Sequence, residues 1–185
     1  MSNQRVAYRY AKALIELAEE QNALDQVKDD MALFRTTCQQ NRDFKLMLIN
    51  PVVTHYKKLT ILKALFKKIT HKITQSFFEI VTRKNRESIL EATASAFLHL
   101  YNIKNGIEEA VVTTSFPLDQ SLKKEFEEVV KRITGKKVIL SEKVNKEILG
   151  GYILKIEDRQ IDDTVLSKLN ELRYRFSQNP YVGNP

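Results

Sequence analysis

The chain has 185 residues, of which 43% are hydrophobic and 29% charged, and its formal net charge is +7. This length admits one large domain or two small ones, and this composition excludes an intrinsically disordered chain. The longest apolar runs, such as Leu46–Ile49, are far shorter than the roughly 20 residues of a membrane-spanning helix. The sequence therefore predicts membrane association only indirectly, through a partner.

Apolar spacing predicts a bundle of six helices in the first half of the chain. Between Arg5 and Tyr101 there is no glycine and a single proline, Pro51, while apolar residues recur at steps of three and four. We expect helices over 4–20, 23–40, 43–49, 56–69, 72–84 and 87–102. The second has a narrow stripe, which predicts packing on one neighbour only: Leu24, Val27, Met31, Phe34 and Cys38.

Cys38 is the only cysteine, so it cannot form an internal disulfide bond. Its place at the end of an apolar stripe indicates a buried structural cysteine rather than a reactive thiol. No charged-then-apolar signal segment precedes Arg5. We therefore expect a cytoplasmic location.

A change of pattern after residue 105 predicts a second domain. The turn-forming stretch Asn102–Gly106 is followed by a β-branched run, and further strands are expected near 138–140 and 152–156, with a return through Ile161. Asp119 and Thr164 can cap two helices. The predicted fold is α+β with two domains: a helical bundle over 1–105, a small α/β domain over 106–176 with a short mixed sheet and two helices, and a flexible tail over 177–185.

The first and fifth predicted helices are apolar over a wider arc than one neighbour can cover. In the first, Tyr10, Ala13 and Leu17 lie within about 40° of Val6, while a second group of mostly alanine residues spreads from about 80° to 140°. In the fifth, Phe78 lies about 140° from Ile73. Such additional surface is either core covered by a third helix or a groove for a partner helix, and periodicity does not separate the two.

The excess positive charge lies in the middle of the chain. Residues 57–105 hold ten Lys and Arg against three Asp and Glu, whereas the segments on either side are balanced. Six lysines cluster there: Lys57, Lys58, Lys63, Lys67, Lys68 and Lys72. They could bind phosphates or an acidic protein surface, but no nucleic-acid motif accompanies them, so we interpret them as a solvated helix face.

No constellation typical of catalysis, metal binding or cofactor binding is recognisable. His55, His71 and His99 are far apart, and Gly150-Gly151 leads into a strand, whereas phosphate-binding glycines leave a strand and open a helix. Asp162 and Asp163 precede a helix, where carboxylates favour the helix dipole. We expect no catalytic residue, no metal and no cofactor.

Several stretches, taken in order, resemble the delta subunit family of F-type ATP synthases, to which the mitochondrial oligomycin-sensitivity-conferring protein is related. The resemblance covers about residues 5–176, and its most specific parts are Ile148–Ile153 and Ile161–Val165. Others are Val6–Leu14, Asn50-Pro51 with Lys57-Lys58, Leu62–Phe66, Arg86, Leu90 and Pro117-Leu118. The sequence departs from the common pattern at Ser115-Phe116 and at Thr164, where serine is usual.

The resemblance implies a non-catalytic stator subunit that joins the catalytic head to the peripheral stalk, so that the head does not turn with the rotor. It implies a groove between the first and fifth helices for the N-terminal helix of an alpha subunit, lined by Ala7, Tyr10, Ala11, Leu14, Phe77, Phe78 and Val81. It also implies contact of the C-terminal ends of the b subunits with Val165, Leu169 and Leu172. The expected location is peripheral, at the cytoplasmic face of a bacterial membrane, since no transit segment is recognisable.

Two other functions are open at this stage. A basic RNA-binding adaptor would use the lysines of residues 57–72, and its affinity would fall steeply with salt. A small hydrolase would use Asp162 or Asp163. The resemblance favours the stator and implies no nucleic-acid partner.

Overall fold

The structure, a computed structural model, describes residues 3–177. The chain divides into two compact units, Met1–Lys104 and Asn105–Pro185. The predicted domain boundary, after residue 105, differs from this division by one residue. Within the described residues the structure contains eight α-helices, one short 3-10 helix and one four-stranded mixed sheet, so the predicted α+β class is confirmed. Most of the predicted tail, from residue 178 on, lies outside the described residues.

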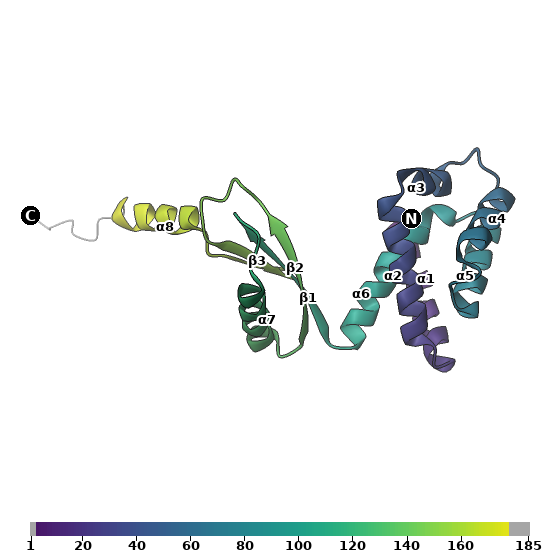
Figure 1. Cartoon of the computed structure of the whole chain (residues 1–185), viewed down its shortest axis with the longest axis horizontal. Coiled ribbons are helices and arrows are strands. Elements are labelled where there is room, and N and C mark those ends of the chain that lie inside the picture. Colours follow the sequence, from purple (N-terminus) through teal and green to yellow (C-terminus); the bar gives the residue numbers. More distant parts are fainter. Residues whose placement is uncertain (1–2, 178–185) are drawn as a thin grey trace, which may run out of the picture. The chain divides into compact units, whose positions relative to one another are not determined.

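The first unit contains the six predicted helices, shown in Figure 1. Their bounds are α1 Asn3–Glu20, α2 Leu24–Gln40, α3 Arg42–Ile49, α4 His55–Phe66, α5 Lys72–Arg83 and α6 Leu90–Lys104, with the 3-10 helix η1 Glu87–Ile89 before α6. The fourth helix ends earlier than predicted. The amides of Ile69 and Thr70 both donate to the Phe66 carbonyl, and these bonds form a turn that closes α4 at Phe66.

An aromatic cluster forms the centre of the first unit. Phe34 of α2 lies 5.9 Å from Phe44 of α3, 5.5 Å from Phe66 of α4 and 5.0 Å from Phe78 of α5, measured between ring centroids. The prediction that the stripe of α2 packs on one neighbour is therefore wrong. A phenylalanine is long enough to reach several short helices that converge on one point.

A buried carboxylate joins α2 to α5. Asp30 Oδ2 accepts hydrogen bonds from the His71 amide at 2.8 Å and from the Thr74 hydroxyl at 2.6 Å. The first amides of a helix have no partner within that helix, so Asp30 supplies one from another helix. This contact fixes where α5 begins, next to the core.

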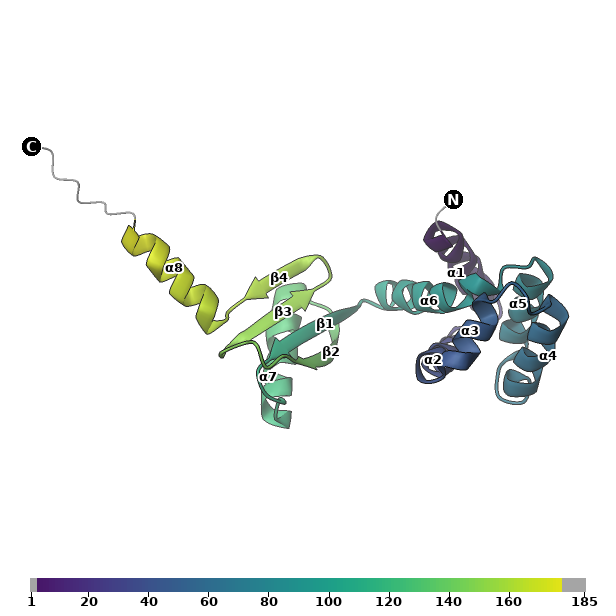
Figure 2. The ribbon, with the colours of Figure 1, turned by 90° about the horizontal axis from the view of Figure 1, so that it is seen from above.

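The second unit is a sheet with one face covered by a helix. It contains β1 Ile107–Thr114, α7 Gln120–Thr134, β2 Lys137–Val144, β3 Tyr152–Ile156, β4 Arg159–Asp162 and α8 Val165–Ser177. The strand order is β2-β1-β3-β4, in which only the β1–β2 pair is parallel, and α7 provides the crossover that a parallel pair requires. Figure 2 shows the four strands together with α7. Phe126 and Val130 of α7 pack on the core formed by Ala110, Val112, Leu154 and Ile156.

The two stretches most typical of the resembling family lie against each other in this unit. The Asp163 amide donates to the Tyr152 carbonyl at 2.9 Å, and the Val165 amide donates to the Gly150 carbonyl at 3.0 Å. Gly151 has φ +83°, and a Cβ atom there would lie 2.3 Å from the Asp163 carbonyl oxygen. This position therefore requires glycine, because both the backbone conformation and the available space exclude a side chain.

Candidate partner-binding surfaces

The predicted groove residues bring α1 and α5 together at one aromatic contact. The rings of Tyr10 and Phe77 meet edge to face with their centroids 6.2 Å apart. The guanidinium group of Arg86 donates to the Tyr10 hydroxyl at 3.2 Å and lies 5.9 Å from the centre of that ring. One side of α1 is thus fixed beside α5.

Most of the other predicted groove residues lie in the core of this chain. These residues are all buried: Ala7, Ala11, Leu14, Phe77, Phe78 and Val81. Phe78 packs on Phe34 and Phe66, which explains why it lies so far round its helix from Ile73. The additional apolar arc is therefore covered by the chain's own helices. Of the predicted set, only Tyr10 is partly exposed.

An accessible apolar surface lies on the other arc of the same two helices. Leu17 is 40% exposed and Ile80 is 55% exposed, and Ala13 is exposed as well. Tyr10, Ala13 and Leu17 share one side of α1, and Phe77 and Ile80 share one side of α5, because their spacings are three and four residues. We call Tyr10, Ala13, Leu17 and Ile80 the α1/α5 face, with the buried ring of Phe77 against Tyr10. Helical spacing in the sequence placed Tyr10, Ala13 and Leu17 together on one arc of α1, but it could not show which arc is covered.

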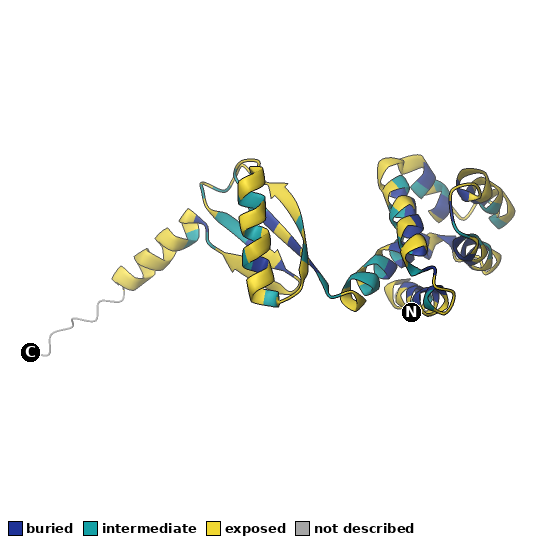
Figure 3. Cartoon of the chain, turned by 60° about the horizontal axis from the view of Figure 1, so that its bottom comes forward, coloured by how far each residue is buried: buried dark blue, intermediate teal, exposed yellow. Residues whose placement is uncertain are grey.

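Helix α8 has no buried residue along its length, as Figure 3 shows. Its apolar stripe recurs at steps of four and three, and every member is exposed: Val165, Leu169, Leu172 and Phe176. No described residue covers this stripe. An exposed row of large apolar side chains on a helix is typical of a surface that another helix covers.

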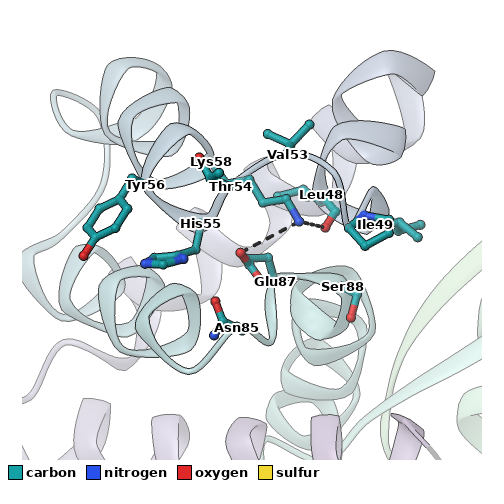
Figure 4. A pocket seen from close by; sticks show the side chains of 11 residues that line it. Leu48, Ile49, Val53, Thr54, His55, Tyr56, Lys58, Asn85, Glu87 and Ser88 are labelled. Carbon is teal, nitrogen blue, oxygen red and sulfur yellow. Dashed lines mark hydrogen bonds and ion pairs between the residues drawn. The ribbon is translucent and has the colours of Figure 1, made fainter.

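The cluster of basic residues is not one solvated face. Lys58 is buried, and Figure 4 shows its ammonium group between two partners. Its Nζ donates to the Leu48 carbonyl at 2.9 Å and lies 3.8 Å from Glu87 Oε1. The interpretation of Lys58 as solvated is wrong. The sequence shows no signal for this, because the partners come from α3 and η1.

Lys58, Leu48 and Glu87 line a cavity of about 500 Å³ near the start of α4. The walls are mixed apolar and polar, and include Ile49, Val53, His55, Tyr56, Asn85 and Ser88. The buried lysine holds the end of α3, the first turn of α4 and η1 together. The other lysines of the cluster are exposed, with Lys63 paired to Glu79.

The residues considered for chemistry have structural partners. Asp162 accepts a hydrogen bond from the Thr164 amide at 3.0 Å and from the Ser167 hydroxyl at 2.9 Å, and such bonds hold its pKa below the usual value. Asp163 pairs with Lys168 at 2.7 Å. Burial raises the pKa of the Cys38 thiol to about 12. Among residues 3–177 there is no group of three metal-ligating side chains and no helix long and apolar enough to span a membrane.

The comparison with protein families decides what kind of chain carries these surfaces. The family described as ATP synthase delta (OSCP) subunit matches residues 6–176. The chain belongs to this family. As a delta-family chain it is also similar over nearly its full length to "ATP synthase subunit delta" of Cytophaga hutchinsonii, with 39% identity over 178 residues that cover 96% of this chain and 97% of the relative.

More distant delta subunits match equally completely. The one from Christiangramia forsetii is 34% identical and the match covers 98% of both chains, and the one from Clostridioides difficile is 30% identical and covers 94% and 96%. A chain from the solved Toxoplasma gondii mitochondrial ATP synthase hexamer has the same fold, with a TM-score of 0.74 at 23% identity over 92% of this chain and 97% of that one. The expected family is confirmed.

Proposed function

We propose that this delta-family chain is a non-catalytic connector in the stator of an ATP synthase. Its first unit binds the catalytic head, its second unit binds the peripheral stalk, and the head is thereby held against rotation. The observation that carries this proposal is that each compact unit has an apolar surface that the chain itself does not cover. A connector needs two such surfaces, whereas an enzyme of this size needs one polar active site.

The α1/α5 face is proposed to receive the amphipathic N-terminal helix of an alpha subunit. The face is apolar, and the Tyr10–Phe77 contact, held by Arg86, defines its floor. The buried residues Ala7, Ala11 and Leu14 support the floor from below rather than touch the partner. A helix laid in such a groove binds through apolar burial, so its affinity should depend weakly on salt.

The stripe of α8 is proposed to bind the C-terminal ends of the b subunits. Val165, Leu169 and Leu172 supply the contact, and Phe176 extends it by one turn. On this proposal the chain reaches the cytoplasmic face of the membrane through the complex alone, with no nucleic-acid partner.

Two matched variants test this arrangement. We expect Leu17→Asp to abolish binding of a labelled alpha N-terminal peptide to the full-length chain, while a fragment from the C-terminal end of a b subunit still binds. Leu169→Asp should do the reverse, because each substitution charges one exposed surface and leaves both cores intact. Fluorescence anisotropy at low and raised salt measures both. Loss of both partners in either variant, or binding that raised salt alone abolishes, would contradict the assignment.

A further inference from the structure

Helix α4 is apolar on two sides, although the chain covers only one. Its inner side carries the buried Leu62 and Phe66, at 1% and 3% exposure, whereas Ile61 and Leu65 are 36% and 47% exposed. Lys57, Ile61, Ala64 and Leu65 recur at steps of three and four, so they share one outer side of α4, and Lys68 follows in the turn after the helix ends at Phe66. We call these five residues the α4 outer stripe. Its middle is apolar and each end carries a lysine.

The charge of this stripe is not compensated by its own segment of the chain. Residues 57–105 contain three acidic residues, and each lies beside another lysine: Glu79 beside Lys63, Glu87 beside Lys58, and Glu91 beside Lys45. The two lysines of the stripe therefore stand on a surface with excess positive charge. An exposed apolar row between two such cations is complementary to an apolar row between two anions.

We propose that the α4 outer stripe binds an acidic amphipathic helix from another protein of the assembly. Lys57 lies in the first turn of α4 and Lys68 lies in the turn after its last residue, so the two cations flank the apolar residues. The partner should therefore carry acidic side chains on both sides of a row of apolar residues. Ala64 in the middle of the stripe lets the partner backbone approach closely. This site is separate from the α1/α5 face and does not depend on it.

The side chains of the stripe favour a protein helix over other acidic partners. Nucleic-acid surfaces combine cations with arginine forks and stacked aromatic rings, whereas this stripe has neither. A membrane-surface helix needs a broad face of large apolar side chains, and on this stripe only Ile61 and Leu65 are large and exposed. Two aliphatic side chains around an alanine, with a cation at each end, match a narrow helix–helix seam.

Photo-crosslinking in the assembled ATP synthase tests the proposal. A benzoylphenylalanine at Leu65 probes the stripe, and one at the exposed Lys63, which is not three or four residues from any member of the stripe, probes another side of the same helix. We expect Leu65 to crosslink to one segment of a neighbouring protein in the complex that carries acidic residues on both sides of an apolar row, and Lys63 not to crosslink to that segment. No adduct at Leu65, or an adduct to lipid, to RNA, to a second copy of this chain or to a segment without acidic residues, would overturn the proposal.

Charge reversal in the same crosslinking assay provides a second test of the proposal. We expect Lys57→Glu with Lys68→Glu to lower the crosslink yield at Leu65 about 10-fold, because two attractive pairs become repulsive. The control, Lys67→Glu with Lys72→Glu, changes the net charge equally off the stripe and should lower the yield less than about 2-fold. Equal losses would overturn the inference. Because the enzyme must be assembled for the assay, failure to assemble counts against the proposed function, whereas an assembled enzyme without the adduct counts only against this site.

Discussion

At the scale of single residues, burial changes the role that charge and reactivity suggest. Lys58 and Glu87 each have side chains only 6% exposed, and they lie 3.8 Å apart in the interior between α3, α4 and η1. Lys63 and Glu79 form a comparable pair on the surface, 49% and 33% exposed. The buried pair must remain intact, because removal of either side chain would leave the other charge buried without its counter-ion.

We expect Lys58→Met to lower the free energy of unfolding by about 3 kcal/mol, since Glu87 is then buried without a cation. Lys58→Met combined with Glu87→Leu should recover much of this loss, because both charges are removed. Lys63→Met serves as the control and should cost less than about 1 kcal/mol. Urea unfolding followed by circular dichroism measures all three. Equal costs for Lys58→Met and Lys63→Met would show that burial of the pair is unimportant.

Cys38 should be inert in the folded chain. Burial is the main cause that raises its thiol pKa to about 12, so almost no thiolate exists near neutral pH. We expect a thiol reagent at pH 8 to react on the order of 10³-fold more slowly with the folded chain than with the chain in denaturing urea. A native rate close to that of the unfolded chain would contradict a buried Cys38.

At the scale of elements, backbone contacts between segments decide positions that propensity leaves open. The turn at Gly150-Gly151 leads into β3 and also contacts the backbone that leads into α8. Gly135 likewise has positive φ, +70°, yet a Cβ atom there would meet nothing within 4 Å. The two glycines therefore separate the cost of backbone conformation from the cost of close packing.

We expect Gly151→Ala to destabilise the second unit by about 3 kcal/mol or more, because strain and a clash with Asp163 add. Gly135→Ala should cost only about 1 kcal/mol, because strain acts alone. Hydrogen exchange of the β1 and β3 amides reports on this unit directly. Similar exchange rates in both variants would mean that the close approach of Gly151 to the Asp163 backbone does not contribute to stability.

At the scale of the whole molecule, each unit has its own hydrophobic core. One cluster of buried residues extends from Ala11 to Phe97 and the other from Ala110 to Ile156. The larger cluster contains the Phe34 ring and needs no residue beyond 104. A unit whose core is complete in this way meets the main physical condition for folding alone.

We therefore expect residues 1–105, produced alone, to form a helical domain with one cooperative thermal transition. The reason is that the whole aromatic cluster and the Asp30 contact to α5 lie within this fragment. Circular dichroism during heating measures the transition, and dye binding detects exposed apolar surface. A broad transition with strong dye binding would show that the unit depends on the rest of the chain.

The sequence by itself determined the identity of the elements and the family. Helical spacing, turn residues and capping residues act between near neighbours in the sequence, so they can be recognised without the tertiary structure. The helix boundaries in the structure differ from the predicted ones by only a few residues. The stretches that contain Gly150-Gly151 and Ile161–Val165 likewise indicate the family from the sequence alone, although the sequence does not show that they lie against each other.

Only the tertiary structure decided which apolar arcs are covered. Phe78 and Leu17 are both apolar residues on amphipathic helices, yet one contacts Phe34 and the other faces solvent. Burial depends on which other helix of the chain packs against a residue, and the apolar periodicity of one helix does not show this. For the same reason Lys58 appeared to be a surface lysine until Leu48 and Glu87 were placed beside it.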